Sequence, residues 1–280
     1  MLKLTSLVAA VGLAASLTGT AQQPRWTVHA VRFATLPFRV SGLVGNLPAA
    51  ERDRMIDIAM MVWVLRGPDN RIVLVDAGFY REKFMQQWKP AAYSKPSDAV
   101  QAALGISPDQ VTDIIVTHIH WDHADGVDLF PRATVWLQRD EYTYHVDDMG
   151  KPKAPAIDSD VATMLHILKE GGRVSLVDGD NQEILPGIRV YTGGKHTYQS
   201  QFVGVAARSG TIIVASDNAY LYENLERRLP IAQTLNPASN LSAQARMLML
   251  AASLNRIVPG HDPAVFERFP KVKDGVVRID

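Results

Sequence analysis

The segment THIHWDHADG, residues 117–126, decides how the rest of this sequence is interpreted. It places three histidines and two aspartates within ten residues. Such polar side chains are costly to bury without partners. The segment is therefore either a polar loop of no consequence or a set of side chains that converges on one ligand. Imidazole and carboxylate together are the ligands that zinc and similar first-row metals prefer.

The spacing within this HxHxDH pattern favours convergence. His118 and His120 are two residues apart, so they point the same way in an extended segment. Asp122 and His123 follow as the chain turns. One short stretch can thus present two imidazoles to one metal, and a carboxylate with an imidazole to a neighbouring metal.

Residues of the same types follow expected strands elsewhere in the chain. His196 lies in TGGKHT and His261 in PGHD, while Asp217 ends the run TIIVASD and Asp76 follows RIVLV. The ends of strands and the loops after them are where α/β proteins place their sites. Seven residues are therefore predicted metal ligands: His118, His120, Asp122, His123, His196, Asp217 and His261.

Strand and helix patterns alternate along the 280 residues without a fixed-period repeat or an evident linker, which predicts an α/β layered domain. Hydrophobic residues make up 47% of the chain, enough for a sizeable core. The expected strands are residues 61–66, 71–78, 113–119, 133–138, 174–179, 188–193, 202–208, 211–217 and 256–262. The expected helices lie within 80–96 and at 97–104, 161–170 and 241–253. Ser97 is expected to cap the second helix and Gly105 to end it.

The N-terminus has the pattern of a secretory signal. One lysine precedes an apolar run from Leu7 to Leu17, and small residues follow as far as Ala21. We expect a signal peptide over residues 1–21, a single domain over 22–280, and export, most simply to a periplasm. The run is too short for a membrane span. The alternative to a signal is a short N-terminal core helix.

Composition narrows the chemistry further. The chain has no cysteine, so no disulfide and no thiolate nucleophile or ligand is available. Formal net charge is +0, which gives no indication of a nucleic-acid partner. With the signal removed, no membrane span is expected.

The order and spacing of the seven predicted ligands resemble the metallo-β-lactamase superfamily, over roughly residues 30–270. The resemblance implies an αββα sandwich with the site at one edge between the sheets. It assigns His118, His120 and His196 to one metal and Asp122, His123 and His261 to a second, with Asp217 bridging. Asp76 would support the site from behind the ligands; the alternative is that it only caps a turn.

Within the superfamily, Asp217-Asn218-Ala219-Tyr220 is similar to a segment of N-acyl-homoserine lactonases. In those enzymes the tyrosine contacts the substrate carbonyl, and Tyr220 takes that place, although it could be a packing aromatic. The pattern departs before His196, where those lactonases usually carry glycine and this chain has Lys195. That departure bears on the substrate, because the loop borders the pocket.

The resemblance implies a dinuclear-zinc hydrolase that opens N-acyl-homoserine lactones or related lactones through a metal-bound hydroxide. Metal binding lowers the pKa of water from ~16 to about 7. Tyr220 would stabilise the oxyanion and Asp122 would pass a proton to the departing alkoxide. Cobalt, manganese or iron could occupy the same ligands. The expected partner is a small lactone or ester, and such lactonases often form homodimers.

Other functions share parts of this pattern. A periplasmic β-lactamase would have the signal and HxHxDH, but no bridging carboxylate such as Asp217. A broad ester hydrolase or a glyoxalase-II-like thioesterase keeps that carboxylate, but the thioesterase usually adds a C-terminal helical part. Oxygen-activating relatives use iron and often a flavin domain. A non-enzymatic metal-binding module would be indicated by a lost ligand, and all seven positions are filled.

Aromatic residues supply candidates for the rest of the site. Trp121, between two predicted ligands, forms either a pocket wall or a support for its loop. Candidates for the pocket or an interface are Phe84, Trp88 and Tyr93.

Overall fold

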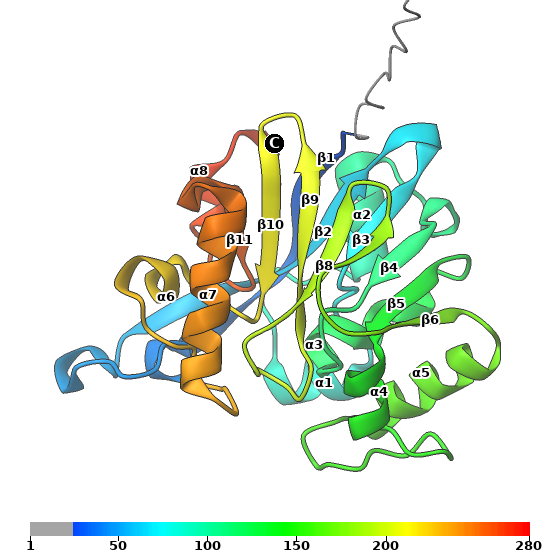
Figure 1. Cartoon of the computed structure of the whole chain (residues 1–280), viewed down its shortest axis with the longest axis horizontal. Coiled ribbons are helices and arrows are strands. Elements are labelled where there is room, and N and C mark those ends of the chain that lie inside the picture. Colours follow the sequence, from blue (N-terminus) through cyan, green and yellow to red (C-terminus); the bar gives the residue numbers. More distant parts are fainter. Residues whose placement is uncertain (1–24) are drawn as a thin grey trace, which may run out of the picture.

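The computed structural model describes residues 25–280. The predicted signal peptide, residues 1–21, lies outside the described residues. Within the described part, the strands form two sheets that face each other, with helices on both outer faces (Figure 1). This is the αββα sandwich that the resemblance implied.

The larger sheet has the strand order β12-β13-β1-β2-β3-β4-β5-β6, and the smaller sheet the order β11-β10-β9-β8-β7. The larger sheet contains β1 (Thr27–Arg39), β2 (Met55–Arg66), β3 (Ile72–Val75), β4 (Asp113–Ile115), β5 (Thr134–Gln138), β6 (Val174–Val177), β12 (Lys271–Lys273) and β13 (Val276–Arg278). The smaller sheet contains β7 (Gln182–Leu185), β8 (Ile188–Thr192), β9 (Gln201–Ala207), β10 (Gly210–Ser216) and β11 (Ile257–Pro259).

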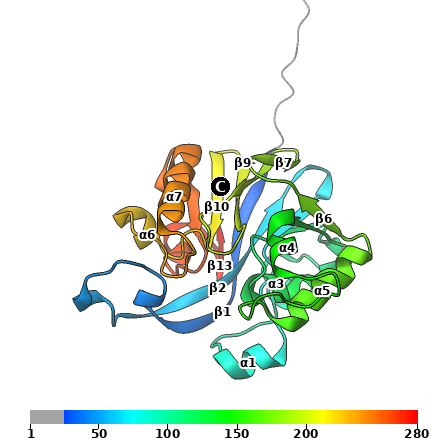
Figure 2. The ribbon, with the colours of Figure 1, turned by 60° about the horizontal axis from the view of Figure 1, so that its bottom comes forward.

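Helices lie on the two outer faces, as the turned view shows: α6 and α7 flank the smaller sheet, and α4 and α5 lie at the opposite side (Figure 2). The helices are α1 (Glu82–Trp88), α2 (Pro96–Leu104), α3 (Trp121–Ala124), α4 (Arg139–His145), α5 (Ser159–Glu170), α6 (Tyr222–Arg227), α7 (Pro237–Ala251) and α8 (Val265–Arg268). Among residues 25–280, no helix combines the length and the apolar character needed to cross a membrane.

The core is divided into two layers by the larger sheet. Along β2, Val62 and Val64 belong to the cluster beneath the helices of that sheet, while Trp63 and Leu65 belong to the cluster between the sheets. Alternate strand residues point to opposite faces, and both faces are covered. This is why β2 carries a continuous apolar run instead of alternating apolar and polar residues.

The predicted hairpin is confirmed, since β2 pairs antiparallel with β3. Two details of the prediction were wrong. The strand expected over 113–119 ends at Ile115, because the chain then turns into the loop that carries the histidines. Helix α2 begins at Pro96 after Lys95, so Ser97 lies inside its first turn and is not the cap. Pro96 fixes the helical φ one residue before the serine. Gly105 does end this helix, with φ +69°.

The topology gathers the predicted site at one edge of the sandwich. Strands β3 and β4 are parallel, and so are β10 and β11, so each pair ends at a common edge. Asp76 follows β3, the histidine-rich segment follows β4, and Asp217 and His261 follow β10 and β11. Residues far apart in sequence thereby meet between the two sheets.

Candidate metal centre

Three histidine rings converge on one point, and we call His118, His120 and His196 the histidine group. The Nε2 atom of His118 lies 3.0 Å from Nδ1 of His120. The Nε2 atom of His196 lies 3.1 Å from the first of these atoms and 3.0 Å from the second. Protons cannot satisfy three ring nitrogens that face one another in pairs, whereas one cation can accept all three lone pairs.

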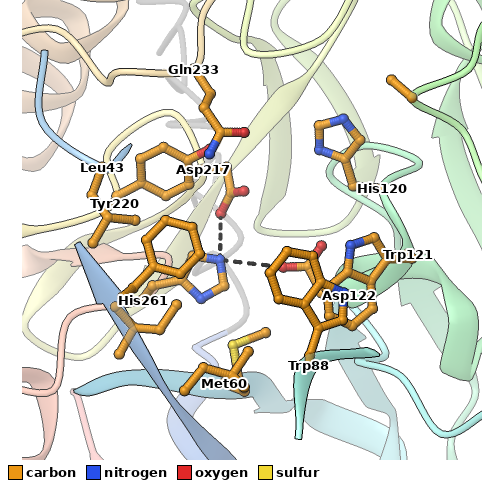
Figure 3. Close-up of a pocket in the computed structure, with 14 residues that line it drawn as sticks. Leu43, Met60, Trp88, His120, Trp121, Asp122, Asp217, Tyr220, Gln233 and His261 are labelled. Carbon is orange, nitrogen blue, oxygen red and sulfur yellow. Dashed lines mark ion pairs between the residues drawn. The ribbon is translucent and has the colours of Figure 1, made fainter. Parts of the chain in front are cut away.

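A second set of ligand atoms lies beside the first, and we call Asp122, His123 and His261 the mixed group. The Oδ2 atom of Asp122 lies 3.5 Å from Nε2 of His123 and 3.7 Å from Nε2 of His261. One carboxylate and two imidazoles form a donor set suited to a divalent first-row metal. Figure 3 shows Asp122 and His261 on neighbouring sides of the pocket.

Asp217 lies between the two groups. Its Oδ2 atom is 3.3 Å from Nε2 of His196 and 3.6 Å from Nε2 of His118, both in the histidine group. The same oxygen is 3.2 Å from Nε2 of His123, and Oδ1 is 3.0 Å from Nε2 of His261. One carboxylate therefore reaches both groups, which is the geometry that a bridging ligand requires.

Contacts behind the rings favour the tautomer in which the ligand nitrogen carries no proton when the ring is neutral. In four histidines Nδ1 contacts an oxygen: Thr117 Oγ1 for His118, Asp76 Oδ2 for His123, the Gln233 carbonyl for His196 and the Ala59 carbonyl for His261. A ring that donates through Nδ1 keeps the Nε2 lone pair for a metal. His120 differs, because its Nδ1 faces the other two rings.

Asp76 is buried behind the centre and holds several of its parts. Its Oδ1 accepts a hydrogen bond from the Thr117 backbone, and its Oδ2 accepts from the hydroxyls of Thr117 and Ser216 and contacts Nδ1 of His123. Asp76 and Ser216 have φ of +59° and +47°, a left-handed backbone that is strained for these residues. Asp76 lies where a supporting residue is required, and that role stays a prediction.

Electrostatics differ between the two groups. Burial opposes charge on His123, yet the carboxylates of Asp217, Asp122 and Asp76 raise its pKa well above the ordinary value. Burial also opposes ionisation of Asp217, but the neighbouring imidazoles of His123 and His261 hold its pKa well below the usual range. The mixed group thus pairs buried carboxylates with positive charge.

The pKa values of His118 and His120, two members of the histidine group, move the other way. Burial, reinforced by the facing imidazoles, lowers the pKa of His118 far below normal and that of His120 to about 3. These rings are neutral near pH 7 and ready to donate lone pairs.

Two buried atoms in the centre lack hydrogen-bond partners among the described residues: Nε2 of His123 and Oδ1 of Asp217. Both lie near other charged groups, but none of these contacts has hydrogen-bond geometry. A buried polar atom without a partner is costly. A divalent cation would satisfy both atoms, so the residues present fit the metal that the motif predicts.

A cavity of about 250 Å³ opens onto this centre. Its polar end is formed by His120, Asp122, Asp217, Tyr220 and His261, which are labelled in Figure 3. The remaining lining is mostly apolar: Leu36, Phe38, Leu43, Ile58, Met60, Trp88, Trp121, Ala156 and Gln233. Apart from residues of the centre, the lining carries no charged side chain among the described residues.

A sequence model of the metallo-beta-lactamase superfamily matches residues 60–261, the segment that carries this centre. The chain belongs to the metallo-beta-lactamase superfamily. Among curated members, it is 28% identical over 167 residues to the N-acyl homoserine lactonase AiiA of Bacillus thuringiensis subsp. kurstaki, a match covering 58% of this chain. The chain spans 57% of that relative's length. It is 24% identical to the lactonase AiiB of Agrobacterium fabrum over 241 residues, covering 79% of this chain and 86% of AiiB.

Solved structures of lactonases share the fold. A quorum-quenching N-acyl homoserine lactone lactonase superposes with a TM-score of 0.72 at 18% identity, over 90% of this chain and 98% of that one. AidC, described as a dizinc quorum-quenching lactonase, gives a TM-score of 0.64 at 14% identity, over 87% and 90% of the two chains. At these identities the likeness establishes the αββα sandwich.

The aromatic candidates of this superfamily member divide into two kinds. Trp121 stacks on Trp88 with ring centroids 5.3 Å apart and planes 8° apart, and both line the cavity. Phe84 also stacks on Trp121, with ring centroids 4.7 Å apart and planes 24° apart, and is buried. Tyr93 packs against Phe79 and does not line the cavity. Trp121 therefore serves both as a pocket wall and as a support for its loop.

Tyr220 and Asp122, the predicted catalytic residues, lie at the polar end of the cavity. The Tyr220 hydroxyl is 3.4 Å from Nδ1 of His196, and its ring packs against His261 at 5.8 Å between centroids. Burial, with the nearby carboxylates of Asp217 and Asp122, raises the pKa of Tyr220 well above 10. The hydroxyl thus keeps its proton and can donate it in a hydrogen bond.

The departure at Lys195 has a structural explanation. Its backbone has φ +61°, the left-handed conformation that glycine adopts without strain. The side chain compensates locally, because Nζ donates to the Tyr198 carbonyl at 2.6 Å and to Oε1 of Gln199 at 3.2 Å. The loop shape that a glycine permits is thus retained with a lysine.

Sequence reasoning did not single out the partners that stand behind the ligands. Thr117 and Ser216 each adjoin a predicted ligand in sequence, and this adjacency could have identified them. The Gln233 and Ala59 carbonyls lie in segments without a motif, so no sequence signal pointed to them.

Proposed function

We propose that this chain is a dinuclear metal hydrolase, with zinc as the metal, that opens the ring of N-acyl-homoserine lactones or related lactones. The observation that carries the proposal is the pair of adjoining ligand groups. They share Asp217 and lie at the polar end of a mostly apolar cavity. The names of the curated relatives, N-acyl homoserine lactonases, support the substrate class.

The histidine group would hold one metal and the mixed group the other, with Asp217 between them. When bound, the metals supply Lewis acidity and a water whose pKa falls to about 7. The chain's own residues orient these ions, because each Nδ1 contact fixes a ring and its tautomer.

The cavity suits a substrate with a polar head and an apolar tail. A lactone ring would lie at the polar end beside Asp122 and Tyr220, and an acyl chain would extend along the apolar lining. The acyl chain would be shielded from water by Leu36, Phe38 and Met60. Each Å² of apolar surface buried in this way contributes roughly 25 cal/mol to the free energy of binding.

Two side chains are proposed to act on the reacting atoms. The Tyr220 hydroxyl, which keeps its proton, would donate a hydrogen bond to the carbonyl oxygen as negative charge develops there. Asp122 would accept a proton from the attacking water and pass it to the ring oxygen that departs as an alkoxide. The product is then the open hydroxy acid, and no serine or cysteine nucleophile is required.

A substrate panel tests the proposal. The full chain, loaded with zinc, is assayed against short- and long-chain acyl-homoserine lactones, a simple aryl ester and nitrocefin. We expect opening of the lactones, and loss of that activity in the Asp217→Asn variant. Turnover of nitrocefin or the ester without lactone opening would contradict the substrate while retaining the hydrolase.

A further inference from the structure

We propose that Glu141, a residue of α4 outside the ligand set, is a positioning residue that fixes the histidine group by joining the two loops that carry it. The inference rests on the metal centre of the proposed function. It goes beyond that function because it assigns the geometry of one of the two groups to a carboxylate that would touch neither metal nor substrate.

The Glu141 side chain is completely buried and contacts both loops. Its Oε2 accepts a hydrogen bond from the backbone N–H of Gln199 at 2.7 Å. Its Oε1 accepts from the backbone N–H of Ile119 at 3.3 Å. Ile119 lies between His118 and His120 in the chain, so one carboxylate ties the segment of these two ligands to the segment that carries the third.

The loop of the third ligand is held on both sides of His196, where the Lys195 carbonyl also accepts from the backbone N–H of Leu235 at 2.8 Å. At its start, the Gly194 backbone donates to Oδ1 of Asn218 at 2.7 Å. At its end it is held by Glu141 and by the stacking of Tyr198 on Tyr144, a neighbour of Glu141 on α4, with centroids 3.9 Å apart. His196 lies between these two anchors, so its ring position depends on both.

Burying a carboxylate is costly unless it is well compensated. His145 lies 3.8 Å from Oε1, but it forms no hydrogen bond with Glu141, and burial lowers the pKa of this histidine. The compensation therefore comes chiefly from the two backbone amides. This explains what the carboxylate stabilises: the mutual placement of two loops that would otherwise present unpartnered N–H groups.

The mixed group has no such tie to Glu141. Asp122 and His123 lie in α3, and His123 is held by Asp76, while His261 follows β11 and is held by the Ala59 carbonyl. Loss of Glu141 should therefore weaken the histidine group selectively, and this selectivity separates positioning from a general structural role.

The test measures metal affinity in place of activity. Metal-free full chain is titrated with Co²⁺ against a competing chelator, and visible absorption follows the binding of each ion. The His120→Ala variant assigns the step that belongs to the histidine group. In the Glu141→Gln variant, one backbone N–H faces the side-chain NH₂ group and loses its acceptor. We therefore expect the Co²⁺ affinity of the histidine group to fall about tenfold. The Co²⁺ affinity of the mixed group should change by less than about threefold.

Asp113→Asn is the matched control. Asp113 is another buried carboxylate with two donors, Nε1 of Trp136 and the Thr112 hydroxyl, at the opposite end of β4. The Asp113→Asn variant should have a lower melting temperature, but the Co²⁺ affinities of the histidine group and the mixed group should not change. If the Glu141→Gln variant does not fold, the Glu141→Asp variant is measured in the same way. Its side chain is one methylene shorter and cannot reach both backbone amides.

Equal losses at both groups, or none, would overturn the positioning role. A wild-type chain that binds no Co²⁺ would overturn the proposed function itself, so the two failures are distinguishable.

Discussion

Single side chains in this centre are controlled by what lies behind them. His123 contacts the buried Asp76 through Nδ1, and His196 contacts a backbone carbonyl. Each contact turns the Nε2 lone pair toward the point where the groups converge. The chemistry at this scale therefore depends on residues that would never touch a substrate.

Tyr220→Phe removes one hydroxyl from the polar end of the cavity. Because that hydroxyl would donate only to the developing oxyanion, kcat for lactone opening should fall about 10²-fold. Metal content should stay the same, since Tyr220 contributes no ligand atom. Steady-state kinetics with elemental analysis check both expectations. A kcat within twofold of wild type would show that Tyr220 is only a packing residue.

Lys195 holds a left-handed backbone at a cost of about 1–2 kcal/mol for a residue with a Cβ. Lys195→Ala loses the Nζ hydrogen bonds and keeps the strain, while Lys195→Gly loses the same bonds and relieves the strain. The glycine variant should therefore be more stable than the alanine variant, by about 1 kcal/mol in the free energy of unfolding. Chemical denaturation of the two variants measures this difference. An alanine variant as stable as the glycine variant would refute the strain.

At the scale of elements, the sequence predicted what neighbouring residues encode. The apolar strands that precede Asp76, Asp217 and His261 were recognised from local patterns, and so was the hairpin of β2 and β3. The cap of α2 was missed, because Pro96 begins the helix before the serine that local preference favours.

Contacts across the fold were not predictable in the same way. Glu141 is 22 residues from Ile119 and 58 from Gln199. Its segment, LQRDEYTY, has no spacing that marks one carboxylate as buried. Only the packing of α4 against both loops distinguishes Glu141 from the neighbouring Asp140, which is exposed.

Helix α7 offers a prediction about its own stability. Asn236 caps it, accepting a hydrogen bond from the Ser239 backbone at 3.0 Å. Asn236→Ala should lower the free energy of unfolding by about 1 kcal/mol. Asn236→Asp, which preserves the acceptor, should lose little. Thermal melts of the two variants compare them directly, and an alanine variant that melts with wild type would contradict the cap.

For the whole molecule, the metal centre joins the two sheets, because its ligands follow strands of both. A protonated imidazole cannot bind a metal. Protons therefore compete with the metal ion for any histidine whose pKa is high in the metal-free chain. Burial opposes charge on His123 and His261, but the neighbouring carboxylates outweigh it and raise the pKa of both residues. Burial lowers the pKa of His118 and His120.

Affinity at the mixed group should therefore rise steeply as pH increases above 6.5, while affinity at the histidine group should change little over the same range. Co²⁺ titrations of the metal-free chain at several pH values between about 6.5 and 8.5 measure both slopes. Equal slopes at the two groups would contradict this electrostatic difference.

We propose that seven side chains hold two metal ions and that both ions share Asp217. Elemental analysis of the purified full chain, after zinc loading and removal of free metal, tests it most directly. We expect two zinc ions per chain, and fewer in Asp217→Asn because the shared ligand oxygen is lost. One ion or none in the wild-type chain would contradict the account.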